Sequence, residues 1–450
     1  MSRAWVIVGS TGAVVFAALA FVHPPAQVGV SPFDRYGKAV VHGQVPYRDF
    51  SLEYPPGALP PIVLPALVPG ASYETAFRGL EALLGAALLA CLAYLLRGVP
   101  VYELALRVGL VAVTPLLLGS VVFFRFDLWP ALLVVASLVA LDLDRPRLSA
   151  GLVGAATAAK LYAGVLLPPL AARTGRAGLA WALGVAAALT LPLSIAGPGG
   201  VAESFIRQLG RGVQIESSAG SAVALASVLG LGHPAVVFAS GSWNVTGAGV
   251  TAIGVVVSSV GVALLAFVWL RLWRSRDGAW DPAVVYAGTV AIVLVATKVL
   301  SPQFLLWLVP LAVLVRGAAG AAASVLLAVA MVLTQLVYPD RYDALVALQR
   351  EPVLLLAARN VVLLAAAATL VGAMLRALHG ERVTEHEGGE RDGEDLRGAV
   401  LLGSGQGDAP DRVPGVEPAL ERRGQHAREA EPGPAAPGLD GEPRSGGERR

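Results

Sequence analysis

The sequence is poor in charge, in cysteine and in lysine. Only 15% of its 450 residues are charged and 55% are hydrophobic, whereas about 25% of the residues in a soluble globular protein are charged. Cys91 is the single cysteine, so the sequence contains no internal disulfide and no cysteine-based metal site. It also lacks a Walker lysine loop and a G-x-G-x-x-G fingerprint, which argues against a nucleotide site. A net charge of +2 from scattered arginines gives no indication of a nucleic-acid partner.

Long apolar segments separated by short basic connections make up most of the chain. They predict an all-α, polytopic integral membrane protein with about ten full spans and a few short re-entrant or partial helices. The stretch 57–69 is apolar but too short to span, since a helix rises ~1.5 Å per residue against a ~30 Å hydrocarbon core. The expected longer helices cover residues 4–22, 74–96, 104–123, 127–143, 149–171, 177–197, 249–272, 282–300, 303–316, 318–338 and 352–376.

The distribution of arginine predicts the topology, because basic connections are enriched on the cytoplasmic side. These connections agree with one another only if 149–171 is broken near Lys160 and returns to the side from which it entered. The loops 23–56 and 198–248 then lie on the outer side. Broken helices occur at membrane depth where they line a cavity, so the topology predicts a cavity that opens outward.

The composition changes at residue 380. Residues 1–379 are expected to form the membrane domain, and residues 380–450 are rich in Gly, Glu, Arg and Pro. We expect this last segment to be a disordered cytoplasmic tail, and the predicted function does not depend on it.

The first outer loop contains the stretch "FDRYGKAVVHGQVPYRDFSLEYPPG" at 33–57, which is unusually dense in charge, aromatic rings and proline. Tyrosines suit packing against a sugar face or a headgroup, and the prolines restrict the backbone around them. The candidate side chains in this loop are Asp34, Arg35, Tyr36, Lys38, Tyr47, Arg48, Asp49, Glu53 and Tyr54.

Two of the three lysines, Lys160 and Lys298, lie in or at the end of apolar segments. Ionisable groups at that depth are costly and usually mark function, although a lysine can also extend its ammonium to the interface. At the junction of two predicted helices, Arg125 is expected to end one helix and Asp127 to cap the next.

The second outer loop offers further polar candidates. Arg207 and Arg211 are four residues apart, so they are expected on one helical face that could hold a phosphate, or that is simply solvated. Gln214 and Glu216 follow. Gln303 lies after the Ser-Pro break of "LSPQF" and offers donors and an acceptor, although a plain turn is an equal interpretation.

Outer carboxylates, cations and aromatic loops together suggest a lipid-linked substrate whose phosphate meets Arg or Lys. Transfer of a sugar from that phosphate needs a base for the acceptor hydroxyl and positive charge for the departing phosphate. Asp34 is the predicted base, with Asp49 and Glu53 in reserve. The candidate cations are Arg35, Arg48, Arg125, Lys160, Arg211 and Lys298.

The loop stretch, "FRFDLWPALLVVASL", "GLVGAATAAKLYAGVLLPPL", "RGVQIESSAGS" and "SPQFLLWLVP" occur in this order. With this order and spacing, the chain resembles the actinobacterial branch of glycosyltransferase family 87, which has a GT-C fold and uses polyprenol-phosphate-mannose. The resemblance implies a bacterial plasma-membrane mannosyltransferase that works on the outer face by inverting single displacement, with Asp34 as base. It also implies that Asp49 and Glu53 shape the sugar or acceptor site. Where the family often has a Lys-Pro pair, this chain has Lys160-Leu161, and Gln303 stands where some members carry histidine.

The expected partners are a polyprenyl-phosphate sugar donor, a lipid or glycan acceptor of the cell envelope, and membrane lipids. We expect no cofactor and no metal, since no D-x-D pair is present. A lipid-linked sugar transporter or flippase is the alternative, although pseudo-symmetric halves, which many transporters show, are not evident. A non-catalytic membrane scaffold is a third alternative, and it leaves the buried lysines unexplained.

Overall fold

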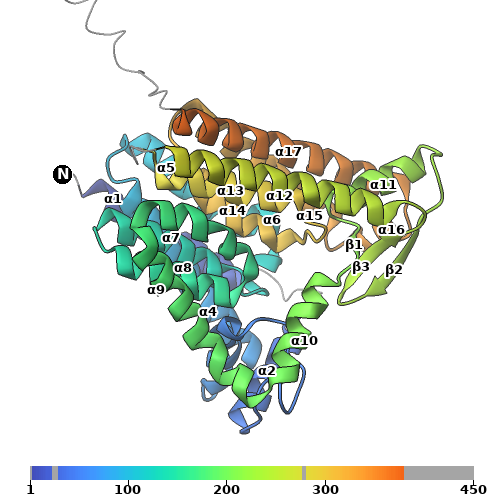
Figure 1. Cartoon of the computed structure of the whole chain (residues 1–450), viewed down its shortest axis with the longest axis horizontal. Helices are drawn as coiled ribbons and strands as arrows, with labels where there is room; N and C mark the ends of the chain where they lie inside the picture. The colour runs from blue at the N-terminus through green and yellow to red at the C-terminus, as the bar shows by residue number, and fades with distance from the viewer. Residues whose placement is uncertain (1–2, 23–28, 276–279, 380–450) are drawn as a thin grey trace, which may run out of the picture. The chain divides into compact units, whose positions relative to one another are not determined.

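The structure is a computed structural model that describes residues 3–22, 29–275 and 280–379. The predicted tail at 380–450 and the start of the first outer loop, 23–28, lie outside these residues. The described chain is predominantly helical, which confirms the predicted helical membrane fold (Figure 1).

The elements follow one another from α1 near the N-terminus to α17. In chain order they are α1 Ala4–Val22, α2 Ser31–Val41, η1 Pro56–Ala58, α3 Leu59–Val63, η2 Leu64–Leu67, α4 Tyr73–Leu95, α5 Val101–Ala112, α6 Thr114–Leu118, η3 Ser120–Phe123, α7 Leu128–Asp142, α8 Pro146–Ala159, η4 Leu161–Leu166, α9 Leu167–Ala196, α10 Pro198–Leu209, β1 Val213–Gln214, α11 Ser218–Val228, β2 Ala235–Ala239, β3 Ser242–Thr246, α12 Val250–Arg274, α13 Pro282–Ala296, η5 Pro302–Phe304, α14 Leu305–Ala312, α15 Gly317–Val337, α16 Tyr342–Val346 and α17 Arg350–Leu378.

Six helices in the described part of the chain are long and apolar enough to cross a membrane. They are α1, α4, the run Leu161–Ala196 formed by η4 and α9, α12, α15 and α17. Shorter apolar helices such as α7 and α13 accompany them. The number of about ten full spans therefore stays a prediction, since length and composition alone identify six.

Close contact between helices depends on glycine. A Cβ on Gly154 of α8 would lie 2.2 Å from the backbone oxygen of Ala182 in α9, and one on Gly85 of α4 would lie 2.0 Å from the ring of Phe16 in α1. Small residues at such contacts let helices approach closely, which is the main way that helices pack in a membrane. Helices α12, α13 and α17 contact one another and run side by side in Figure 1.

The predicted helix at 104–123 is wrong as a single element. The chain forms α5, α6 and η3 there instead. Pro115 lacks an N–H and its ring clashes with the preceding turn, so α5 ends at Ala112. Gly119, with φ +78°, ends α6, a conformation that glycine adopts without strain. The expected helices 149–171 and 177–197 are not separated by a loop. The end of the first and all but the last residue of the second belong to α9, which is kinked at Gly175.

The predicted break near Lys160 is confirmed. Lys160 is extended, with φ −157° and ψ 124°, between α8 and η4. The partial helix expected at 57–69 is the run η1, α3 and η2, and it packs against this break. A Cβ on Gly57 would lie 2.5 Å from backbone atoms of Ala158 and Ala159, so the two interrupted segments meet backbone to backbone.

The second outer loop contains an antiparallel sheet of order β1-β3-β2, which the all-α prediction missed. Ser240 and Gly241, both with positive φ, connect β2 to β3. Two such residues form the tight turn that matches the twist of a hairpin. The sheet joins α10 to α12 and brings β1 and the β2–β3 turn to the pocket described below.

Candidate functional site

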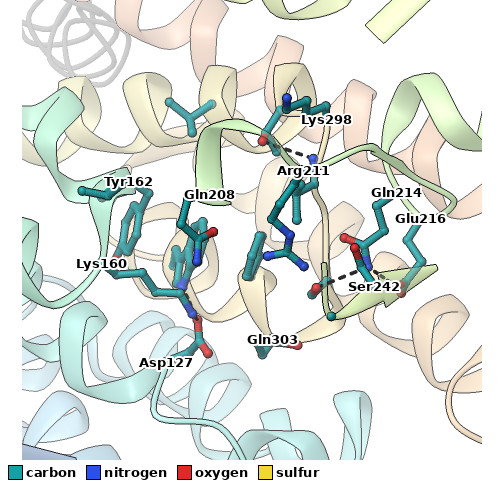
Figure 2. Close-up of a pocket in the computed structure, with 18 of the residues that line it drawn as sticks. Asp127, Lys160, Tyr162, Gln208, Arg211, Gln214, Glu216, Ser242, Lys298 and Gln303 are labelled. Carbon is teal, nitrogen blue, oxygen red and sulfur yellow. Dashed lines mark hydrogen bonds and ion pairs between the residues drawn. The ribbon is translucent and has the colours of Figure 1, made fainter. Parts of the chain in front are cut away.

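A pocket of about 850 Å³ lies where the interrupted helices, the small sheet and the α13–α14 connection meet (Figure 2). Its charged side chains come from widely separated parts of the sequence. Four are cations and three are carboxylates: Arg125, Lys160, Arg211, Lys298, Glu53, Asp127 and Glu216.

At one end of the pocket, Lys160 and Asp127 form a buried ion pair. Lys160 Nζ lies 2.5 Å from Asp127 Oδ1, and the two side chains are 15% and 1% exposed. Trp307 Nε1 donates to the same Oδ1 at 2.6 Å. Asp127 stands at the N-cap position of α7, as predicted, but the expected side-chain capping hydrogen bond is absent and its Oδ1 accepts from Lys160 and Trp307 instead.

Aromatic rings surround this ion pair. The ring of Trp307 stacks on that of Tyr162, with centroids 4.0 Å apart, and on that of Phe304, with centroids 3.9 Å apart. Lys160 Nζ lies 5.1 Å from the ring centroids of Phe304 and Trp307 and 5.0 Å from that of Phe126. These rings stabilise the ammonium of Lys160. Its charge is neutralised by Asp127, so the ammonium is not available to a ligand.

Arg211 lies in the middle of the pocket in Figure 2, between the ion pair and the carboxylate of Glu216. Its Nε is buried without a hydrogen-bond partner in the described residues. The prediction that it shares a helical face with Arg207 is wrong, because α10 ends at Leu209 and Gly210 turns the chain. Arg207 pairs with Glu203 at 2.5 Å on the exposed face of α10 and does not line the pocket.

Lys298 makes hydrogen bonds to the loop that carries Arg211, on both sides of that residue. Its Nζ donates to the backbone oxygen of Leu209 at 2.7 Å, and its own backbone oxygen accepts from Gln214 N at 2.9 Å. The side chain thus ties the α13–α14 connection to the α10–β1 loop. Gln303, from the same connection, also lines the pocket.

Glu216 forms the other end of the pocket. Its Oε2 accepts from Gln214 Nε2 at 2.8 Å and from Tyr342 Oη at 3.0 Å. Its backbone oxygen accepts from Arg359 Nη2 at 3.0 Å and from Asn360 Nδ2 at 3.2 Å. Burial raises the pKa of Glu216 to about 7, against the opposing effect of Arg359. The carboxyl group therefore titrates near neutral pH.

The structure brings ten of the predicted site residues to this pocket and leaves eight outside it. The ten are Glu53, Tyr54, Arg125, Asp127, Lys160, Arg211, Gln214, Glu216, Lys298 and Gln303. The eight are Asp34, Arg35, Tyr36, Lys38, Tyr47, Arg48, Asp49 and Arg207.

Most of the outside group belongs to the first outer loop, part of which is the helix α2. Asp34 lies in its first turn, is 31% exposed and pairs with Lys38 at 2.9 Å. The role of Asp34 as base stays a prediction. Asp49 pairs with Arg48 at 2.8 Å, and the hydrogen bond from Arg48 lowers the pKa of Asp49 to about 2.

The aromatic side chains of this loop pack on one another. Tyr36 lies under the Arg35 guanidinium, 5.6 Å from the ring centroid, and stacks on Phe50. Tyr47 Oη donates to the backbone oxygen of Tyr54 at 2.5 Å. Tyr54, which does line the pocket, meets the ring of Phe126 edge to face. These contacts fix the loop beside the pocket.

Sequence reasoning missed several polar residues in and around the site. Trp307 and Tyr342 contact the pocket carboxylates directly, but an isolated Trp or Tyr carries no signal of this in the sequence. Glu81 of α4 is fully buried, with both carboxyl oxygens unpartnered in the described residues. A lone acid in an apolar segment marks a site candidate, so the sequence did contain a signal for Glu81.

No group of three or more His, Cys, Asp or Glu side chains that could hold a metal ion occurs within 3–22, 29–275 and 280–379. Comparison with family models matches residues 52–302, more than half of the chain, to glycosyltransferase family 87. A search of curated proteins finds no match. The matched segment contains the pocket residues from Glu53 to Pro302, whereas five others lie beyond it: Gln303, Phe304, Trp307, Tyr338 and Tyr342.

Proposed function

The chain belongs to glycosyltransferase family 87, and from that premise we propose that it transfers a sugar from a polyprenyl-phosphate donor to an acceptor hydroxyl in the pocket around Arg211. Family membership makes it a membrane glycosyltransferase. The donor, mannose as the sugar, a cell-envelope lipid or glycan as acceptor, and a site on the outer face of the plasma membrane with the C-terminus inside are parts of the proposal.

The observation that carries the proposal is the unpartnered guanidinium nitrogen of Arg211. The Lys160–Asp127 pair neutralises itself, so three cations face the two remaining carboxylates of the pocket. A buried donor without a partner is costly, and a phosphate oxygen would satisfy Arg211 Nε. Arginine suits phosphate because its planar donors match the geometry of the oxygens.

A lipid tail has an apolar path from this phosphate position. Residues of α12 and α13 such as Gly261, Leu265 and Ile292 line one wall of the pocket. Val262 lines the pocket as well and is 65% exposed. The pocket thus reaches the apolar outer surface of α12, where an acyl or isoprenoid chain could lie in the bilayer.

In the proposed reaction, the acceptor oxygen bonds to C1 of the sugar while the bond from C1 to the phosphate oxygen breaks. A carboxylate takes the hydroxyl proton, and the polyprenyl phosphate leaves with its new charge near Arg211. This single displacement inverts the configuration at C1. The family resemblance assigns the base role to Asp34. Among the described residues, Glu53 and Glu216 are the pocket carboxylates without an ion pair, and Glu216 already accepts hydrogen bonds from Gln214 and Tyr342.

The test is transfer of radiolabelled mannose from polyprenyl-phosphate mannose by the purified full chain in proteoliposomes, with a panel of envelope lipids as acceptors. Loss of a charged hydrogen bond costs about 1.5–3 kcal/mol, so Arg211→Ala should lower kcat/KM by roughly 10–150-fold. Arg274→Ala, an exposed arginine at the end of α12, is the matched control and should retain wild-type activity. Absence of transfer from every polyprenyl-phosphate sugar would refute the proposal and favour a transporter.

The same assay identifies the base. Loss of a general base lowers the rate by about 10²–10⁴-fold. Asp34→Asn should show a loss of this size if the resemblance assigns the base correctly. A loss confined to Glu53→Gln would transfer the role to the pocket carboxylate.

A further inference from the structure

Three polar side chains within six residues of the second outer loop, Arg211, Gln214 and Glu216, present free hydrogen-bonding atoms to the pocket. Arg211 Nε and Gln214 Oε1 are buried without partners in the described part of the chain. Both hydrogen bonds to the Glu216 carboxylate reach Oε2, and none of the described residues donates to its Oε1. The loop therefore offers one free donor followed by two free acceptors.

The orientation of the Gln214 amide is set by its neighbours. Its Nε2 donates to Glu216 Oε2 at 2.8 Å and to Ser301 Oγ at 3.4 Å. With both donors directed to these oxygens, Oε1 remains as an acceptor. Glu216 thus acts in two ways, through its own free oxygen and by fixing the amide of Gln214.

This acceptor pair is held rigidly. Arg359 and Asn360 of α17 donate to the backbone oxygen of Glu216, and Tyr342 of α16 donates to its carboxylate. Glu216 and Gln214 are each 4% exposed. Buried acceptors fixed in this way bind a ligand hydroxyl without a large cost in conformational freedom.

A sugar phosphate matches the pattern, since its phosphate accepts hydrogen bonds and its hydroxyls donate them. We propose that Gln214 and Glu216 bind two hydroxyl groups of the transferred sugar while its phosphate lies at Arg211, so that this pair determines which sugar the enzyme accepts. The inference rests on the proposed function, because it places the same donor in the same pocket. In Figure 2, Gln214 and Glu216 lie on the side of Arg211 opposite to Lys160, which orients the sugar toward α16.

Ionisation of Glu216 supports this role near neutral pH. When ionised, the carboxylate acts only as an acceptor, so Oε1 is free for the sugar hydroxyl while Oε2 accepts from Gln214 and Tyr342. Burial raises its pKa to about 7. The charged and titratable groups that interact with it are Arg359 from α17, Tyr342 from α16 and Tyr338 from the end of α15. Arg359 favours the carboxylate, whereas burial opposes it.

The experiment compares polyprenyl-phosphate mannose with its 2-, 3-, 4- and 6-deoxy analogues as donors to the full-length enzyme in proteoliposomes. Wild type should use two of the deoxy donors about 10–100-fold less efficiently in kcat/KM, because each leaves a buried acceptor unpaired. In Gln214→Leu one of the two penalties should fall to about twofold or less. In Glu216→Gln the other should do so.

Two further variants separate recognition from folding. Tyr342→Phe keeps the ring and removes only the donor to Glu216, so both penalties should persist at high pH. Glu351→Gln changes an exposed carboxylate at the start of α17 and should match wild type with every donor. Each protein is checked by size-exclusion chromatography and thermal unfolding in detergent.

Two results would overturn the inference and can be told apart. If wild type transfers mannose but both variants keep the full deoxy penalties, the pair is only structural and the proposed function stands. If wild type transfers sugar from no polyprenyl-phosphate donor, the proposed function fails and the inference fails with it.

Discussion

The buried pair of Lys160 and Asp127 gives the sharpest prediction of stability. Lys160→Met keeps a long apolar stem among the surrounding rings of Phe126, Phe304 and Trp307 but removes the ammonium. The Asp127 carboxylate, 1% exposed, then keeps only the hydrogen bond from Trp307.

The expected magnitude follows from this burial. Removing one partner of a buried ion pair costs about 3–5 kcal/mol, because the other charge stays buried without compensation. The double variant Lys160→Met/Asp127→Leu removes that charge. It leaves Trp307 Nε1 without its acceptor, which costs about 1–3 kcal/mol. The double variant should therefore be more stable than Lys160→Met alone.

Thermal unfolding of wild type, Lys160→Met, Asp127→Leu and the double variant in one detergent measures this order. Lys160→Met should lower Tm by roughly 5–10 °C, and the double variant should recover about half of the loss. If the losses of the two single variants simply add in the double variant, the two side chains are not coupled and the structural assignment of a buried ion pair is refuted.

Three other changes test the packing and the titration of the pocket. Gly57→Ala places a Cβ 2.5 Å from the backbone at the end of α8, so it should lower the free energy of unfolding by about 1–3 kcal/mol. The control Gly79→Ala, whose Cβ would have nothing within 4 Å, should not lower Tm. Equal Tm values for the two variants would contradict the close contact at Gly57. Because the pKa of Glu216 is raised to about 7, kcat/KM should fall as pH decreases through 7, and this limb should vanish in Glu216→Gln; a limb that persists belongs to another group. Tyr342→Phe removes a hydrogen bond to the carboxylate form, so the midpoint of the limb should move to higher pH, and an unchanged midpoint in the pH–rate profile would speak against the contact.

The sequence predicted the helical membrane class and the break at Lys160 because both follow from composition and from the distribution of charge along the chain. Apolar runs determine the helices, and the mutual consistency of the basic connections requires the break. The breaks at Pro115 and Gly119 were also visible in the sequence, but hydropathy outweighed them in the prediction. The hairpin turn at Ser240-Gly241 was a recognisable signal, because a glycine at a turn between two short apolar stretches favours a β-hairpin.

The pocket could be predicted only in part. Lys160 was identified because an ionisable group in an apolar segment stands out, and Arg211 and Glu216 were identified as polar candidates of the second outer loop. The contacts of Trp307 and Tyr342 could not be predicted. Trp307 donates to Asp127 from 180 residues away, and Tyr342 donates to Glu216 from 126 residues away. Such long-range pairs depend on helix packing, which a single sequence does not reveal.

Asp34 shows the limit of loop reasoning. Its motif drew attention to the first outer loop, but the local helix α2 places Lys38 four residues later, within reach of the carboxylate. The motif of the first outer loop therefore predicted that this loop lies at the pocket. It did not predict which carboxylate lines it, and Glu53, at the other end of the same loop, does so.

The central claim is that the pocket around Arg211 transfers a sugar from a polyprenyl-phosphate donor. The most direct measurement is kcat/KM for transfer from polyprenyl-phosphate mannose by wild type, Arg211→Ala and Arg274→Ala in proteoliposomes. The account predicts transfer by wild type and Arg274→Ala, and a loss of roughly 10–150-fold in Arg211→Ala. Equal activity of all three proteins would contradict the assignment of the pocket, and no transfer by wild type from any such donor would contradict the function itself.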